Sequence, residues 1–181
     1  MKKVFDYQTE WSGLQNRLAQ IFDSKSGHTV MLAVDHGYFQ GVPSGLEDIS
    51  ETVGKLLPYC DAISPTIGGL HKCFDSNIRT PIILRATGGN SMTLENELDD
   101  EIITVSIDEI LRTNAIGFTA SVYIGLPHQR QTIGNLTSLV NEAHKYGLIA
   151  IGITAVGKGL KELHEKNPKE KLKYIKHASR V

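Results

Sequence analysis

Thr29-Val30-Met31-Leu32-Ala33-Val34-Asp35-His36-Gly37 is the stretch of sequence that decides the fold. Positions 30–34 are apolar without interruption, so both faces of an extended segment would be buried there. Strands that are buried on both faces are typical of parallel sheets covered by helices. An acid and a histidine follow at once. We therefore predict a buried parallel strand that brings Asp35 and His36 to the edge of a sheet.

The same alternation of short apolar strand and longer amphipathic helix continues along the chain. Apolar residues recur at helical spacing at about 14–22, 46–57, 66–74, 106–113, 129–146 and 169–181. Strands are expected at 29–34, 60–64, 81–86, 117–124 and 148–156, with a loop over 87–101 and a short extended piece at 102–105. Strands spaced by about 20 to 35 residues indicate repeated βα units, which form a parallel sheet. In the last helix we expect Leu172, Ile175, Ala178 and Ser179 to face inward.

Two architectures fit such repeats, an open doubly wound sheet and a closed barrel. An open sheet normally carries a glycine-rich phosphate loop after its first strand, but no G-x-G-x-x-G follows the first strand here. A closed barrel takes eight βα units and roughly 250 residues. The 181 residues supply about five units. We therefore expect an α/β protein in which residues 1–28 form an N-terminal extension and helix and residues 29–181 an incomplete (β/α)₈ TIM barrel. A complete five-stranded protein is the alternative.

Composition narrows the class of protein. Hydrophobic residues make up 40% and charged residues 22% of the chain, as in ordinary globular proteins. A formal net charge of -1 gives no field that would attract nucleic acid or an anionic membrane, and no apolar run reaches the roughly 18 residues of a membrane helix. The two cysteines, Cys60 and Cys73, do not make a disulfide framework. We expect a cytoplasmic protein with no nucleic-acid or membrane partner.

Asp35 is the most informative candidate for catalysis, because active sites of parallel α/β proteins lie at the carboxyl ends of the strands. A carboxylate that directly follows an apolar strand is partly desolvated, which raises its pKa and suits it to proton transfer. Alternatively, Asp35 caps the next loop or pairs with Arg85 or a lysine. His36 suits phosphate binding or proton shuttling, and a structural role suits it equally.

Four further candidates follow later strands. Arg85 could hold a phosphate bidentately, or form a salt bridge inside the mouth of the sheet. Tyr123 and Thr154 offer hydroxyl groups at strand ends, with packing as the alternative for Tyr123. Lys158 could bind substrate or could be a solvated loop lysine. Together these groups suit a small phosphorylated carbonyl substrate, and they predict no metal site.

Several motifs resemble one family, in the same order along the chain. They are RLAQIF at 17–22, DHGYFQG at 35–41, LRATGGNS at 84–91, VYIG at 122–125 and TAVGK at 154–158. With them, the chain from about residue 13 to residue 181 resembles the archaeal-type class I (Schiff-base) fructose-bisphosphate aldolase family. The resemblance implies a (β/α)₈ barrel, a phosphorylated keto substrate, a homo-oligomer and no bound cofactor.

The resemblance also implies a division of the chemistry. Asp35 matches the strand-one aspartate that faces the substrate. The lysine that forms the Schiff base would lie on a sixth strand, and the loops that grip the phosphate would follow strands seven and eight, all beyond Val181. A Schiff-base enzyme needs a buried lysine of lowered pKa, and none of the apolar strands expected here contains a lysine. We therefore expect the chain to be a fragment that is inactive alone.

One departure from the family's pattern favours a particular branch. Aldolases of the family carry a tyrosine proton donor in a Y-P-R-G motif after strand five, where this chain has TAVGK at 154–158. This favours the thiolase branch of autoinducer-2 breakdown. Such an enzyme would transfer an acetyl group from a phosphorylated 2,4-dione to the co-substrate coenzyme A, giving dihydroxyacetone phosphate and acetyl-CoA. The alternatives are a class I aldolase that cleaves or forms a phosphorylated ketose, a synthase of an amino-dideoxy sugar acid, and an inactive truncated fragment.

Overall fold

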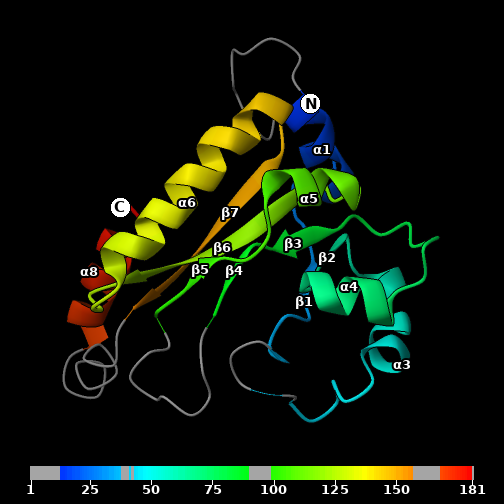
Figure 1. Ribbon diagram of the computed structural model, residues 1–181, viewed down its shortest axis with the longest axis horizontal. Coiled ribbons are helices and arrows are strands. Elements are labelled where there is room, and N and C mark those ends of the chain that lie inside the picture. Colours follow the sequence, from blue (N-terminus) through cyan, green and yellow to red (C-terminus); the bar gives the residue numbers. More distant parts are fainter. Residues whose placement is uncertain (1–12, 38–40, 42, 90–98, 157–167, 181) are drawn as a thin grey trace.

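Five parallel strands form the framework of the molecule (Figure 1). The computed structural model describes residues 13–37, 41, 43–89, 99–156 and 168–180. The strands are β1 Met31–Ala33, β2 Ala62–Ser64, β3 Ile83–Arg85, β6 Gly117–Ile124 and β7 Ile149–Val156. β1 pairs with β2, and β6 pairs with both β3 and β7, while a parallel bridge between Ile63 and Ile82 joins the two groups. The five predicted strands are confirmed. The burial predicted for both faces of the first strand is wrong, because Met31 and Leu32 are only part-buried, Ala33 is exposed and Val30 is 57% exposed; among the described strands β1 has a neighbour on one side alone.

The order of these strands across the sheet follows their order in the chain. A doubly wound sheet reverses direction at a switch point, where its ligand binds. Among these five strands no reversal occurs. The sheet therefore winds in one direction, as a barrel does, and this decides between the two architectures that the sequence allows.

Helices precede, connect and follow the strands. They are α1 Gly13–Ile21, α3 Ile49–Gly54, η1 Leu57–Tyr59, α4 Ile67–Cys73, α5 Ile107–Arg112, α6 Gln129–Ala143, η2 His144–Tyr146 and α8 Pro168–Ala178. The predicted helices are confirmed, with ends that differ by a few residues. At α5 the Ser106 hydroxyl accepts a hydrogen bond of 3.2 Å from the amide of Glu109, which is the cap that the sequence S-x-x-E favours.

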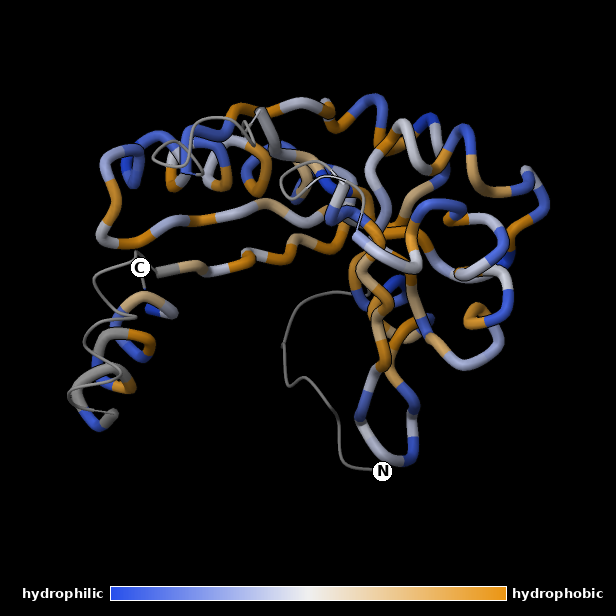
Figure 2. The backbone as a smooth tube through the Cα atoms, turned by 90° about the horizontal axis from the view of Figure 1, so that it is seen from below, coloured by the Kyte–Doolittle hydropathy of each residue, from blue (hydrophilic) through white to orange (hydrophobic). Residues whose placement is uncertain are grey.

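Apolar side chains pack on both faces of the sheet. The larger cluster joins the outer face to α4, α5 and α6 and includes Ile63, Leu70, Leu84, Ile107, Ile110, Phe118 and Leu139. A smaller cluster joins Ile21 of α1 to Ala62, Ile83 and Ile149 on the inner face. Arg17 of α1 also donates to the carbonyls of Tyr146 and Gly147, at 2.8 Å each. In Figure 2 orange is densest near the centre of the molecule, whereas the helices around it alternate between blue and orange.

The predicted loop over 87–101 is wrong in part. Thr87–Gly88 forms β4, which pairs antiparallel with β5 at Ile102–Ile103. Residues 90–98, which belong to the same predicted loop, lie outside the described residues. The pairing is local to the carboxyl end of β3, and it brings the residue before β5, Glu101, into the interior at 0% exposure.

The inward orientation predicted for the last helix is wrong for three of its residues. Leu172 and Ile175 are 52% and 40% exposed and Ser179 is exposed, whereas Ala178 is buried. An apolar helix face is buried only where another element packs on it, and the described elements leave much of Leu172 and Ile175 uncovered. None of the helices that the structure describes is long and apolar enough to cross a membrane.

Candidate active site

The inner face of the sheet becomes polar toward the carboxyl ends of the strands. Side chains alternate between the two faces of a strand. In β6, Phe118 and Ala120 belong to the outer apolar cluster, so Thr119, Ser121 and Tyr123 face inward. Ser64 of β2 lies beside Thr119, with 3.5 Å between the two hydroxyl oxygens. The inner face thus changes from an apolar floor to a polar mouth.

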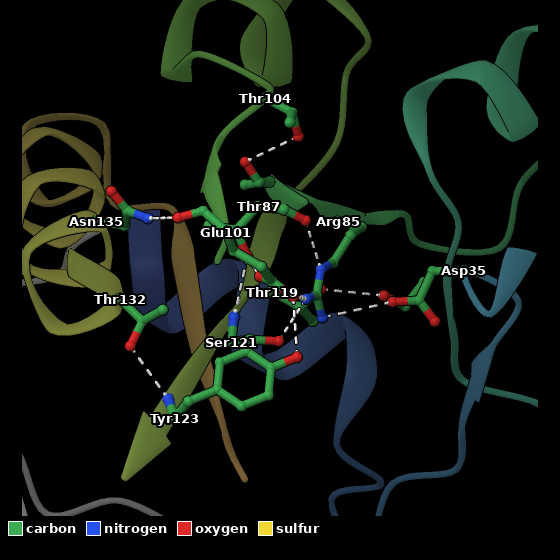
Figure 3. A network of polar contacts seen from close by, with 12 residues as sticks. Asp35, Arg85, Thr87, Glu101, Thr104, Thr119, Ser121, Tyr123, Thr132 and Asn135 are labelled. Carbon is green, nitrogen blue, oxygen red and sulfur yellow. Dashed lines mark hydrogen bonds and ion pairs between the residues drawn. The ribbon is translucent and has the colours of Figure 1, made fainter. Parts of the chain in front are cut away.

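Arg85, at the end of β3, is the centre of the polar contacts in this mouth (Figure 3). Its Nε donates to the carbonyl of Thr87 at 2.8 Å, and its Nη2 donates to both carboxylate oxygens of Glu101 at 2.8 and 2.9 Å. Nη2 also donates to the hydroxyl of Ser121. Nη1 lies 3.7 Å from Oδ2 of Asp35. The guanidinium therefore bridges two carboxylates that come from distant parts of the chain.

Glu101 receives more donors than Arg85 alone. The hydroxyl of Thr87 donates to its Oε2 at 2.6 Å, and the hydroxyl of Tyr123 to its Oε1 at 3.1 Å. The amides of Gln131 and Asn135, both on α6, donate to the main-chain carbonyl of Glu101 at 2.7 Å each. A buried charge is stable only when it is paired and hydrogen-bonded. Glu101 meets this condition and is held from β4, β6 and α6.

Asp35 lies at the end of β1 and is 5% exposed. Burial raises the pKa of its carboxyl above the ordinary value, and the negative charge of Glu101 acts in the same direction. The positive charge of Arg85, and His36, oppose that rise in pKa. A carboxyl with a raised pKa exchanges protons near neutral pH more readily than an exposed one. The geometry therefore suits Asp35 to acid–base chemistry.

The structure brings together three of the six predicted site residues. Asp35, Arg85 and Tyr123 share one set of contacts in the mouth (Figure 3). For Arg85, the salt bridge weighed from the sequence is present. Burial and the charge of Glu101 raise the pKa of Tyr123, so the phenol stays protonated and donates.

The other three predicted site residues, His36, Thr154 and Lys158, are not part of this set of contacts around Arg85. His36 lies beside Asp35, with 3.9 Å between Nδ1 and Oδ1 and a side chain that is 40% exposed, so it stands at the rim. Thr154, a residue of β7, is exposed and lies opposite Val122 of β6. It shares the face of Gly152, which lies against Leu136 of α6, so its side chain is directed away from the mouth. Lys158 lies outside the described residues.

Three residues of the mouth escape the sequence reasoning: Thr87, Glu101 and Ser121. Ser121 and Thr87 could have been found, because each lies two positions from a residue expected to face inward and side chains alternate along a strand. Glu101 stands among other acidic residues at 95–101, and nothing local distinguishes it. No group of three or more His, Cys, Asp or Glu side chains among the described residues is placed to hold a metal ion.

Comparison with known proteins gives relatives but no matching family model. The chain is 42% identical over 151 residues to an uncharacterized aldolase of Pasteurella multocida. It is 40% identical over 151 residues to the 3-hydroxy-5-phosphonooxypentane-2,4-dione thiolase of Yersinia enterocolitica. Each alignment covers 83% of this chain and 51% of the relative, so the chain spans about half the length of these curated relatives.

Solved structures give the same fold. An archaeal fructose-1,6-bisphosphate aldolase with its catalytic lysine bound to a carbinolamine intermediate matches with a TM-score of 0.65 and 21% identity. A Schiff-base-forming fructose-1,6-bisphosphate aldolase matches with a TM-score of 0.63 and 21% identity. Both matches cover 80% of this chain and 59% of the solved chain. Over the residues that it spans, the chain is therefore a relative of the 3-hydroxy-5-phosphonooxypentane-2,4-dione thiolases with part of the barrel fold of the Schiff-base aldolases.

Proposed function

We propose that the protein acts as a class I aldolase-like thiolase. It would transfer an acetyl group from a phosphorylated 2,4-dione, a product of autoinducer-2 breakdown, to coenzyme A, giving dihydroxyacetone phosphate and acetyl-CoA. The names of its relatives support this reaction class. The observation that carries the proposal is the buried carboxyl of Asp35 at the end of the first strand.

Asp35 would move the proton that the reaction requires. As the thiol of coenzyme A forms its bond to the acetyl carbon and the carbon–carbon bond breaks, the reaction needs a group that takes the thiol proton and returns one to the carbon that becomes part of dihydroxyacetone phosphate. Because its pKa is raised, Asp35 can take up and release such a proton at moderate cost. It also lies on the inner face, where the carbonyl end of a bound substrate would reach it.

Substrate contacts would come from the rim of the mouth. His36, half-exposed beside Asp35, suits the phosphate. The hydroxyl oxygen of Tyr123, whose proton is donated to Glu101, can accept from a hydroxyl group of the substrate. We also propose Lys158, which lies outside the described residues, as a substrate contact. Thr154 would contact substrate only if its side chain turned from the outer face. The described strands contain no lysine, so we assign the Schiff-base amine to a segment that follows Val181, as the greater length of the relatives allows.

The proposal also covers the co-substrate, the cellular compartment and the oligomeric state. Coenzyme A would be a co-substrate, with no resident cofactor or metal. We place the protein in the cytoplasm as a homo-oligomer, without nucleic-acid or membrane partners. Cys60 and Cys73 are both free thiols, which fits a reducing compartment.

Trapping of the Schiff base tests the proposal. The full-length product of the gene is incubated with dihydroxyacetone phosphate and borohydride, and its intact mass is measured. Borohydride reduces an imine between lysine and the ketone to a stable amine, so we expect a mass increase that is absent without dihydroxyacetone phosphate. No adduct on the full-length protein would overturn the assignment.

A second measurement separates thiolase from aldolase, the alternative that the Pasteurella relative's name favours. Consumption of the phosphorylated dione is followed with and without coenzyme A. A thiolase needs coenzyme A in every turnover. Cleavage of a phosphorylated ketose without coenzyme A would identify an aldolase instead.

A further inference from the structure

We propose that Glu101 and Arg85 are positioning residues for Asp35, and that Arg85 does not bind the substrate phosphate. Glu101 holds the guanidinium so that it orients Asp35 without fully neutralising it. This inference rests on the proposed function, in which Asp35 exchanges protons with the substrate.

The donors of Arg85 are directed at protein groups. Nε is bound by the carbonyl of Thr87, and Nη2 by Glu101 and Ser121. Nη1 faces Asp35. A phosphate could be held bidentately only if Arg85 left Glu101, which is fully buried. Leaving a buried carboxylate without its cation is strongly unfavourable, so the geometry opposes a phosphate at this arginine.

Glu101 is fixed more firmly than Asp35. Its carboxylate accepts from Arg85, Thr87 and Tyr123, and its carbonyl accepts from two amides of α6. Asp35 has the longer contact with the shared guanidinium, 3.7 Å against 2.8 Å for Glu101. Interaction energy falls with distance. Glu101 therefore takes the larger share of the attraction of Arg85.

The charges that face Asp35 follow from this arrangement. Among the described residues they are Arg85 from β3, Glu101 from the position before β5, and the neighbouring His36. Two carboxylates thus share one guanidinium, and a lone Arg85–Asp35 pair would lower the pKa of Asp35. Glu101 prevents this in two ways: its charge repels the ionised form of Asp35, and its hydrogen bonds keep Nη2 turned away.

Replacement of Glu101 by glutamine tests the inference. We expect the acidic limb of the pH–rate profile to move to lower pH in Glu101→Gln, because the pKa of Asp35 falls. The rate constant kcat should drop roughly tenfold or more while KM stays within about threefold, as for a residue that acts on the chemical step. Glu109→Gln is the matched control, since Glu109 pairs with Arg112 at the surface and loses the same charge.

A readout without substrate separates this inference from the proposed function. The difference in melting temperature between a protein and its Asp35→Asn counterpart changes with pH according to the pKa of Asp35. We expect that pH dependence to shrink in the Glu101→Gln background and to stay unchanged in Glu109→Gln. If this pH dependence shrinks in Glu101→Gln but the wild type shows no turnover, the proposed function fails, while the effect of Glu101 on the pKa of Asp35 is still supported.

Two results would overturn the inference. One is an unchanged pH dependence of both readouts in Glu101→Gln. The other is a large rise in KM with an unaltered pH–rate profile in Arg85→Lys, which would make Arg85 a ligand of the substrate. Should Glu101→Gln fail to fold, Glu101→Asp carries the test. It keeps the charge but shortens the reach to Arg85, so a smaller shift in the same direction is expected.

Discussion

Asp35 and Glu101 show how one residue type takes two roles in one cavity. Both are carboxylates in contact with Arg85, and both are buried. Glu101 is surrounded by donors, so its charge is compensated. Among the described residues Asp35 has fewer donors, and burial raises its pKa. Surroundings thus make one carboxylate structural and leave the other available for proton exchange.

The raised pKa of Asp35 predicts a pH-dependent stability difference. A carboxyl whose pKa is higher in the folded than in the unfolded state stabilises the fold below its unfolded pKa, and this contribution is lost as pH rises through the folded pKa. Asp35→Asn cannot ionise, so it escapes that loss. We expect its melting temperature relative to wild type to increase from about pH 4 to pH 7.

Thermal melts of both proteins across this range measure the effect, with Glu47→Gln, an exposed carboxylate, as the control. A relative melting temperature of Asp35→Asn that decreases toward neutral pH would mean that the ionised carboxyl is net stabilised by Arg85.

The end of η2 requires a glycine. Gly147 ends η2 at a φ of 62°, and an added Cβ would lie 2.7 Å from the amide nitrogen of Leu14. The left-handed conformation costs a residue with a Cβ about 1–2 kcal/mol, and contact with α1 adds to this. We expect Gly147→Ala to lower the free energy of unfolding by about 2 kcal/mol or more, measured by urea denaturation.

Gly134→Ala is the matched comparison. Gly134 lies inside α6, and an added Cβ would meet open space. Alanine there restricts the unfolded chain and favours the helix, so stability should rise by about 0.5–1 kcal/mol. Equal effects at the two positions would contradict this assignment of backbone strain.

The elements were predictable to the extent that their causes are local. Periodicity finds β6 at 117–124 and α6 from residue 129, and the apolar run before Asp35 finds β1. Arg85 and Tyr123 follow because strand ends converge. Glu101 does not follow, since its burial depends on pairing between Thr87 and Ile103. The exposure of Leu172 depends on which elements pack against α8, and the periodicity of a helix does not predict its packing partners.

The sheet as a whole has two unpaired edges. Among the described strands, β1 pairs only with β2, and β7 pairs only with β6 along its length. Within β7, Ile153 is 41% exposed. Unpaired edges with apolar neighbours promote association.

We therefore expect the 181-residue chain, expressed by itself, to associate at micromolar concentrations. Size-exclusion chromatography with light scattering measures its mass. A monomer at these concentrations would contradict this prediction.

The most direct test of the account compares turnover of wild type and Asp35→Asn in the full-length protein, with the phosphorylated dione and coenzyme A as substrates. Loss of a group that transfers the proton should reduce kcat by roughly 10² to 10⁴-fold, while the melting temperature at pH 7 stays equal or rises. Normal specific activity together with a large fall in melting temperature would show that Asp35 is structural and would contradict the account.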